Sequence, residues 1–136
     1  IDTPDGLIVP NIKNVDSKSI FQISNEVNEL ASLAKTRKLK VEQLKGATFT
    51  ISSLSGIGGK YFTPIINPPE VGILGLSKTY DSLSMIDKNI ITLKQLPISL
   101  SYDHRIINGA YAAKFIVELG IQLKQIDLFI RTFKES

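Results

Sequence analysis

The chain of 136 residues contains no cysteine and only one histidine. The lack of cysteine excludes disulfides, Cys-ligated zinc, iron–sulfur clusters and a thiol nucleophile supplied by the chain itself. With one imidazole as well, the composition argues against a structural metal site. The chemistry open to the chain therefore rests on one imidazole and on hydroxyl, amide, carboxyl and cationic groups.

Long apolar runs are also missing. No run approaches the roughly 18 residues that a membrane-spanning helix needs. The first residues, IDTPDGL, have neither the basic start nor the apolar stretch of a signal peptide. We expect a protein of an aqueous compartment with no membrane partner, and the missing initiator methionine favours an internal fragment of a longer protein.

Charge of one sign is not concentrated anywhere. The formal charge is +3 and the pI about 9.1, but 16 basic residues are scattered among 13 acidic ones. The densest basic stretch, KTRKLK at residues 35–40, follows an amphipathic segment and is typical of a solvated helix end. The pattern disfavours nucleic-acid binding.

Hydrophobic residues make up 43% and charged residues 21% of the chain, which indicates an ordinary globular protein. Its length fits one domain, residues 1–136. In the first half we predict a short strand at residues 6–15. A helix follows, with Asp16 or Ser17 as its N-cap and its end near Arg37.

A strand at residues 47–54 precedes the glycine-rich stretch SGIGGK and a proline-rich extended connection. We then predict a buried strand at residues 70–78, a polar stretch at 81–89 and one long strand at 90–104 with a proline irregularity. Asn108 would cap a second helix, whose apolar face runs as far as Ile126. The order of elements predicts a mixed α/β fold.

His104 lies where the last predicted strand meets the last helix. A solitary histidine is more often a surface or structural residue, but strand ends that lead into helix starts are where α/β proteins collect functional groups. Asn108 can cap the helix and offer its amide to the same neighbourhood. Asp103 and Arg105 flank the imidazole, and we predict that they form an ion pair that fixes the turn.

Ser52 and Ser53 end the strand before the glycine-rich stretch. From spacing alone, both hydroxyls are expected to satisfy turn backbone groups. The stretch is not a phosphate-binding loop, because Tyr61 stands where such loops need Ser or Thr and the first glycine of GxxxxGK is missing. Its glycines instead indicate a tight turn or a close backbone approach.

Three segments, in this order, resemble a known family: DTPDGLIVPNIKNV, GATFTISSLSGIGGKYFTPIINPPEVGILGLSK and LPISLSYDHRIINGA. LSYDHRIINGAYAAKF is similar to the DHRxxDGAxxxxF signature of the dihydrolipoyl acyltransferases, the E2 cores of the 2-oxo acid dehydrogenase complexes. The TISSL and SYDH phrasing is most similar to the bacterial pyruvate dehydrogenase members. The resemblance implies the C-terminal portion of a chloramphenicol acetyltransferase-like fold, with a mixed sheet and flanking helices.

The resemblance also implies a reaction, the transfer of acetyl between coenzyme A and a dihydrolipoyl-lysine arm. His104 would be the general base that deprotonates the attacking thiol, which belongs to the substrate. Ser52 would hydrogen-bond the oxyanion, and Ser53 would border the coenzyme A channel. Asn108 stands where most of the family has aspartate, as it does in some pyruvate-type members.

The implied partners follow from the same resemblance. They are a homotrimer with its active site between neighbouring subunits, a larger cubic or icosahedral core, lipoyl domains that carry the lipoyl-lysine, and the E1 and E3 subunits bound through domains absent from this chain. No metal is implied. The compartment would be the bacterial cytoplasm, or the mitochondrial matrix in a eukaryote.

Two alternatives remain at this stage. The chain could be a non-catalytic structural or assembly fragment of such a core. A serine hydrolase built on Ser52 and His104 is disfavoured, because TISSLSG lacks the GxSxG elbow and no acid is convincingly placed.

Overall fold

A computed structural model describes residues 1–125. Contacts along the chain divide it into two compact units, residues 1–48 and the part that begins at Phe49. Each unit is described by itself below. The residues predicted to extend the last helix to Ile126, and the C-terminal tail, lie outside the described residues.

The first unit is built around helix α1 (Ile20–Lys35). Its N-cap is Ser19, whose hydroxyl accepts a hydrogen bond from the backbone N–H of Gln22, while the Gln22 side chain accepts one from the Ser19 N–H. This capping box satisfies two donors at the helix start. The prediction of Asp16 or Ser17 as the cap is therefore wrong, since Val15–Ser17 form a separate 3₁₀ turn, η1.

The strand predicted at residues 6–15 is also much shorter than expected. Only β1 (Asp2–Thr3) and β2 (Gly6–Leu7) pair, in an antiparallel hairpin. Asn14 adopts a left-handed conformation, with φ of 54°, which ends any extended run. The segment after β2 instead bonds to the last residue of η2 (Val41–Gln43), through the Asn11 N–H and the Gln43 carbonyl at 2.7 Å.

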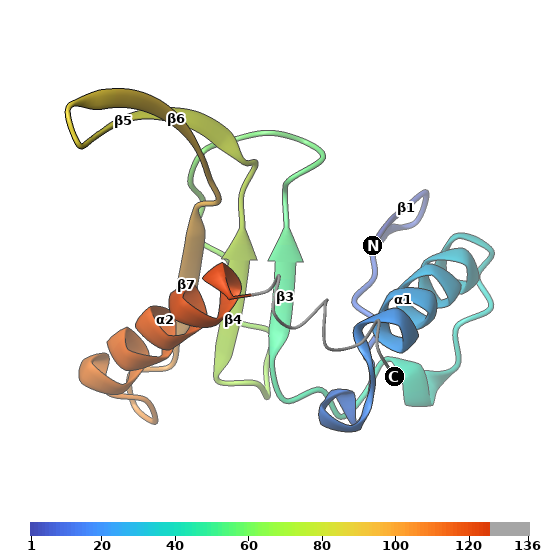
Figure 1. Cartoon of the computed structure of the whole chain (residues 1–136). Helices are drawn as coiled ribbons and strands as arrows, with labels where there is room; N and C mark the ends of the chain where they lie inside the picture. Colours follow the sequence, from blue (N-terminus) through green and yellow to red (C-terminus); the bar gives the residue numbers. More distant parts are fainter. Residues whose placement is uncertain (126–136) are drawn as a thin grey trace. The chain divides into compact units, whose positions relative to one another are not determined.

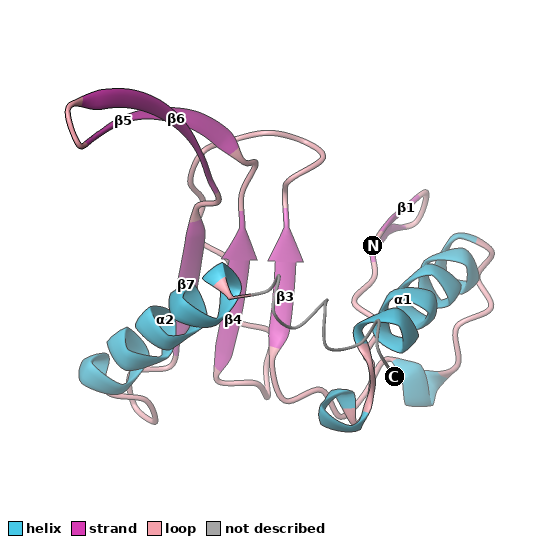
Figure 2. Ribbon diagram, in the orientation of Figure 1, coloured by secondary structure: helices cyan, strands magenta, loops and turns pink. Residues whose placement is uncertain are grey.

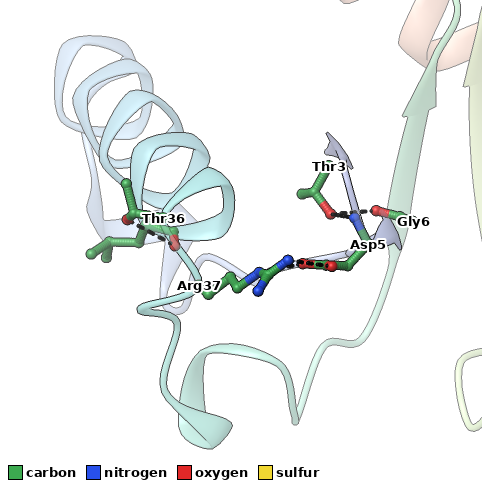
Figure 3. A network of polar contacts seen from close by, with 6 residues as sticks. Thr3, Asp5, Gly6, Thr36 and Arg37 are labelled. Carbon is green, nitrogen blue, oxygen red and sulfur yellow. Dashed lines mark hydrogen bonds and ion pairs between the residues drawn. The ribbon is translucent and has the colours of Figure 1, made fainter.

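An ion pair joins this hairpin to the end of α1 (Figure 3). Arg37, with φ of 58°, donates from Nε and Nη2 to the two carboxylate oxygens of Asp5, both at 2.6 Å. Thr36 donates to the Ser32 carbonyl, and Thr3 donates to that of Gly6. The Arg37 side chain is 73% exposed, so this pair adds little stability.

The second unit contains a three-stranded sheet and a helix (Figures 1 and 2). The strands β3 (Thr50–Ser53), β4 (Gly72–Leu76) and β7 (Ile98–Tyr102) are ordered β3-β4-β7. β3 runs parallel to β4, and β7 runs antiparallel to it. Helix α2 (Gly109–Lys124) follows β7. The predicted strands at 47–54 and 70–78 and the predicted second helix are confirmed within the described residues, as is the mixed α/β class.

The two faces of this sheet are covered by different segments. Gly72 faces the ring of Phe49, which packs against Phe115 of α2 at a centroid distance of 5.9 Å. Gly75 faces the other way, toward Phe62, whose ring would come within 2.8 Å of a Cβ at that position. Because side chains alternate along a strand, α2 covers one face and the proline-rich connection covers the other.

A second sheet, the hairpin of β5 (Tyr80–Ile86) and β6 (Asn89–Gln95), corrects two predictions. The stretch predicted as polar is mostly strand β5. The single strand predicted at residues 90–104 is two strands, separated at Leu96 and Pro97, because proline lacks the N–H that a continuous ladder needs.

Candidate active site

Ser52 lies near the C-terminal end of β3, in register with Gly75 of β4. Its side chain is half-buried, and in the part of the chain that the structure describes its hydroxyl makes no hydrogen bond. Ser53, by contrast, is exposed. Its hydroxyl lies 3.0 Å from that of Ser55 and accepts from the Ser55 N–H at 3.4 Å. The expected turn-capping role therefore holds for Ser53 and leaves the Ser52 hydroxyl available.

The loop after Ser53 turns on glycine. Gly58 and Gly59 have φ of 129° and 87°, a region that side chains rarely adopt. This confirms the tight turn predicted for SGIGGK. The positive φ angles account for these glycines without a phosphate-binding role.

His104 occupies a tight turn between β7 and α2, and its side chain is exposed. The Asp103 N–H continues the sheet by donating to the Val71 carbonyl at 2.9 Å. The Asp103 carbonyl then accepts from the N–H groups of Ile106 and Ile107, at 3.0 and 2.9 Å. These bonds fix the backbone on both sides of the imidazole.

The ion pair predicted between Asp103 and Arg105 is present. The Asp103 carboxylate accepts from the Arg105 backbone N–H, from Nε and from Nη2, the last at 2.6 Å. The hydrogen bond from the Arg105 guanidinium lowers the pKa of Asp103 to about 2, and the backbone N–H of Arg105 adds to the effect. The Asp103 side chain is 18% exposed and that of Arg105 89% exposed, so the pair clamps the turn from its solvent side.

Asn108 is the N-cap of α2, as predicted. Its side-chain oxygen accepts from the Tyr111 N–H at 2.8 Å. The cap uses the side-chain oxygen and does not engage the amide N–H groups. An aspartate at this position could form the same cap but would carry a negative charge and no donor.

Tyr102 is a site residue that the sequence analysis missed. Its ring lies 5.6 Å from the imidazole of His104, centroid to centroid, at an interplanar angle of 39°. The signal was available, because residues two apart in an extended chain point to the same side.

Within one copy of the chain, Ser52 and His104 do not come together. Ser52 pairs with Gly75 of β4, which pairs with Ser99 of β7. Beyond Ser99, β7 continues for three more residues, about 10 Å, before the His104 turn begins. The side chains also belong to different faces: Ser52 shares the Gly75 face, and Tyr102 shares the Gly72 face with α2. This geometry excludes a Ser–His hydrolase pair within one copy.

Two kinds of feature are absent from residues 1–125. No group of three or more His, Cys, Asp or Glu residues there could hold a metal ion. No helix in the same part of the chain is long and apolar enough to cross a membrane.

The family model described as 2-oxoacid dehydrogenases acyltransferase (catalytic domain) matches residues 1–130. The chain belongs to this family. It is 53% identical over 126 residues to the dihydrolipoyllysine-residue acetyltransferase component of the pyruvate dehydrogenase complex of Azotobacter vinelandii, covering 93% of the chain and 20% of that protein. The corresponding protein of Cupriavidus necator is 52% identical over 119 residues, which cover 88% of the chain and 22% of that protein.

Solved structures agree with these relatives. One comes from crystallographic and enzymatic investigations on the role of a serine, a histidine and an asparagine in the catalytic mechanism of the A. vinelandii dihydrolipoamide acetyltransferase. Its TM-score is 0.90 and its identity 51%, over 96% of this chain and 54% of that one. Another is the cubic core of a pyruvate dehydrogenase multienzyme complex, with a TM-score of 0.90, 52% identity and the same coverage. The chain thus spans about a fifth of these curated relatives and about half of the solved chains.

Proposed function

We propose that residues 1–136 form the C-terminal portion of an acetyltransferase domain that moves acetyl between dihydrolipoyl-lysine and coenzyme A in a bacterial pyruvate dehydrogenase complex. One observation carries the assignment of residues. In the A. vinelandii enzyme, the serine under investigation precedes the histidine by 52 positions and the asparagine follows it by four. Ser52, His104 and Asn108 have the same separations in this chain.

In this proposal His104 is the general base. It takes the proton from the thiol of coenzyme A or of the dihydrolipoyl arm, and the sulfur then attacks the carbonyl carbon of the acetyl thioester. The tetrahedral intermediate collapses by breaking the original C–S bond, and the leaving sulfur takes the proton back from the imidazolium. The chain needs no cysteine, because both sulfurs belong to substrates. An imidazole on an exposed turn suits this task, since the base must meet a group that arrives from outside.

Ser52 is the oxyanion donor. A hydroxyl with no partner of its own can donate to the negative oxygen of the tetrahedral intermediate, and such a donor typically stabilises the transition state by about 3 kcal/mol. Ser53, on the next position of β3, borders the coenzyme A channel. Asn108 holds the helix that follows His104 and offers its amide to the same space.

The active site is completed by a second copy. The separation of Ser52 and His104 along the sheet, and their different faces, support a site in which one subunit supplies the serine and the next supplies the histidine. Such a head-to-tail contact closes into a ring, here a trimer, and trimers would build the cubic core. The lipoyl arm, and the E1 and E3 subunits, would be brought by domains outside this chain.

Replacement of the imidazole tests the proposal. In the full-length protein, His104→Ala should lower acetyl transfer from acetyl-coenzyme A to dihydrolipoamide by about 10²- to 10⁴-fold, the usual value of a general base. Solution mass should be unchanged. Glu118→Gln, an exposed change on α2, is the matched control and should retain turnover. Near-normal turnover of His104→Ala would refute the proposal.

The match to the cubic core of a pyruvate dehydrogenase multienzyme complex favours a second candidate, a protein that keeps the fold but has an assembly role alone. Calorimetry with coenzyme A separates the two. The catalytic proposal expects saturable binding in the assembled full-length protein, whereas an assembly module should bind none.

A further inference from the structure

The imidazole of His104 is exposed and, among the residues the structure describes, makes no hydrogen bond that would set the orientation of its ring. An exposed side chain without such a bond ordinarily samples several rotamers. Its neighbours must therefore decide which way it points. The turn fixes only the backbone, through the carbonyl and carboxylate of Asp103.

Tyr102 is the neighbour that contacts the ring. It is the last residue of β7 and is half-buried, so its own position is set by the sheet and by α2. Together with Tyr111, Ala112 and Phe115 of the helix, Tyr102 lines one apolar cavity. The ring pair with His104, at 5.6 Å and 39°, is in the range of tilted aromatic packing.

Gly109, the first residue of α2, lies near both rings. A Cβ at Gly109 would lie 3.6 Å from the Tyr102 hydroxyl and 3.9 Å from Nε2 of His104. The polar ends of both rings therefore point to the same residue at the start of the helix, and a side chain there would touch both.

We propose that Tyr102 is a positioning residue, whose aromatic ring holds the His104 imidazole in the orientation that catalysis needs. This inference rests on the proposed role of His104 as the base. The ring acts by shape, and the phenolic hydroxyl is not required. An imidazole free to rotate would meet the incoming thiol in the correct geometry less often, and catalysis is sensitive to displacements of about 1 Å.

Two replacements separate the ring from the hydroxyl. In the full-length assembled protein, Tyr102→Phe keeps the ring and should keep kcat within about twofold, whereas Tyr102→Met keeps apolar bulk without a ring and should lower kcat about ten- to a hundredfold. KM for both substrates should stay within about twofold in each, since neither change removes a substrate contact. Tyr102→Leu is the second ring-free variant if Tyr102→Met fails to assemble.

A readout without turnover accompanies the kinetics. Diethylpyrocarbonate acylates imidazole nitrogens, and mass spectrometry of the peptide that carries His104 measures the rate at one fixed pH. Loss of the covering ring should raise this rate several-fold in Tyr102→Met and leave it unchanged in Tyr102→Phe. Phe21→Leu removes an exposed ring from α1, in the first unit, and should leave the modification rate unchanged.

The experiments distinguish failure of the positioning role of Tyr102 from failure of the proposed function. If His104→Ala retains turnover, the base assignment fails. If His104→Ala is inactive but Tyr102→Met has wild-type kcat and modification rate, the positioning role alone is overturned. It is likewise overturned if Tyr102→Phe is as defective as Tyr102→Met, because the hydroxyl would then be the group that matters.

Discussion

The two ends of the β3-β4-β7 sheet differ in how firmly they hold their functional groups. At the His104 end, the side chains of Asp103 and Asn108 accept from the backbone N–H groups of Arg105 and Tyr111, which hold the turn and the helix start that follow the imidazole. At the other end, Ser52 is followed by a turn that depends on Gly58 and Gly59. A base must be preorganised toward a thiol that arrives from outside, whereas a hydroxyl donor can rotate to meet the oxyanion. Under the proposed function, each end of the sheet would carry one half of the chemistry.

Among the variants described below, we expect the largest effect at the serine end of the sheet, as a loss of kcat. Ser52→Ala should lower kcat by about 10²- to 10³-fold, because one oxyanion donor is lost. Ser53→Ala changes a hydroxyl one residue away, on the other face of β3. It should keep kcat and raise KM for coenzyme A. Steady-state kinetics on both variants check the contrast, and equal losses of kcat would contradict the separate roles.

A smaller effect is expected at the histidine end. Asn108→Ala removes the N-cap of α2 and should lower the free energy of unfolding by about 1 kcal/mol. Asn108→Asp keeps a capping oxygen and should retain most of that stability. Urea unfolding measures both changes. If Asn108→Asp were as unstable as Asn108→Ala, the cap would not be what holds the helix start.

The smallest effect concerns the clamp on the turn. Arg105 lowers the pKa of Asp103 to about 2, below its ordinary value of 3.8. A carboxyl group whose pKa is lower in the folded than in the unfolded chain stabilises the fold at every pH above its unfolded pKa. This contribution is lost as the pH falls through the folded pKa of about 2. Arg105→Ala should therefore destabilise slightly at about pH 5 and cease to differ from wild type near pH 2. Thermal unfolding across this range checks the sign, and a difference that grows on acidification would contradict it.

Parts of the fold with strong local signals could be predicted from the sequence. The second helix begins at Asn108 as its capping chemistry indicates, and the apolar strand at residues 70–78 is β4. Hairpin β5–β6 was not predicted. Asp87 and Lys88 adopt φ of 50° and 64° at its turn, but the sequence lacks the Asn-Gly or Asp-Gly pair that usually marks such a turn. Alternation of Leu83 and Met85 with serines was present and was overlooked.

The candidate site likewise has some residues that local sequence signals reveal and others that they do not. His104 and Asn108 could be found because a strand end and a helix cap are local features. The start of α1 was missed although Ser19 and Gln22 carry the spacing of a capping box. The ring contact of Tyr102, and the separation of Ser52 from His104, depend on strand register and on which face each strand turns to the helix. Such information arises only when distant segments pair.

The central claim is that Ser52 of one copy and His104 of another form one active site. Co-assembly of Ser52→Ala chains with His104→Ala chains tests it directly, because a shared site can pair an intact serine with an intact histidine. The account predicts that equal, randomly mixed full-length chains regain about a quarter of wild-type acetyl transfer, while each variant alone has almost none. If both residues act within one copy, every chain carries a defect, and the mixture would show no more activity than its two components.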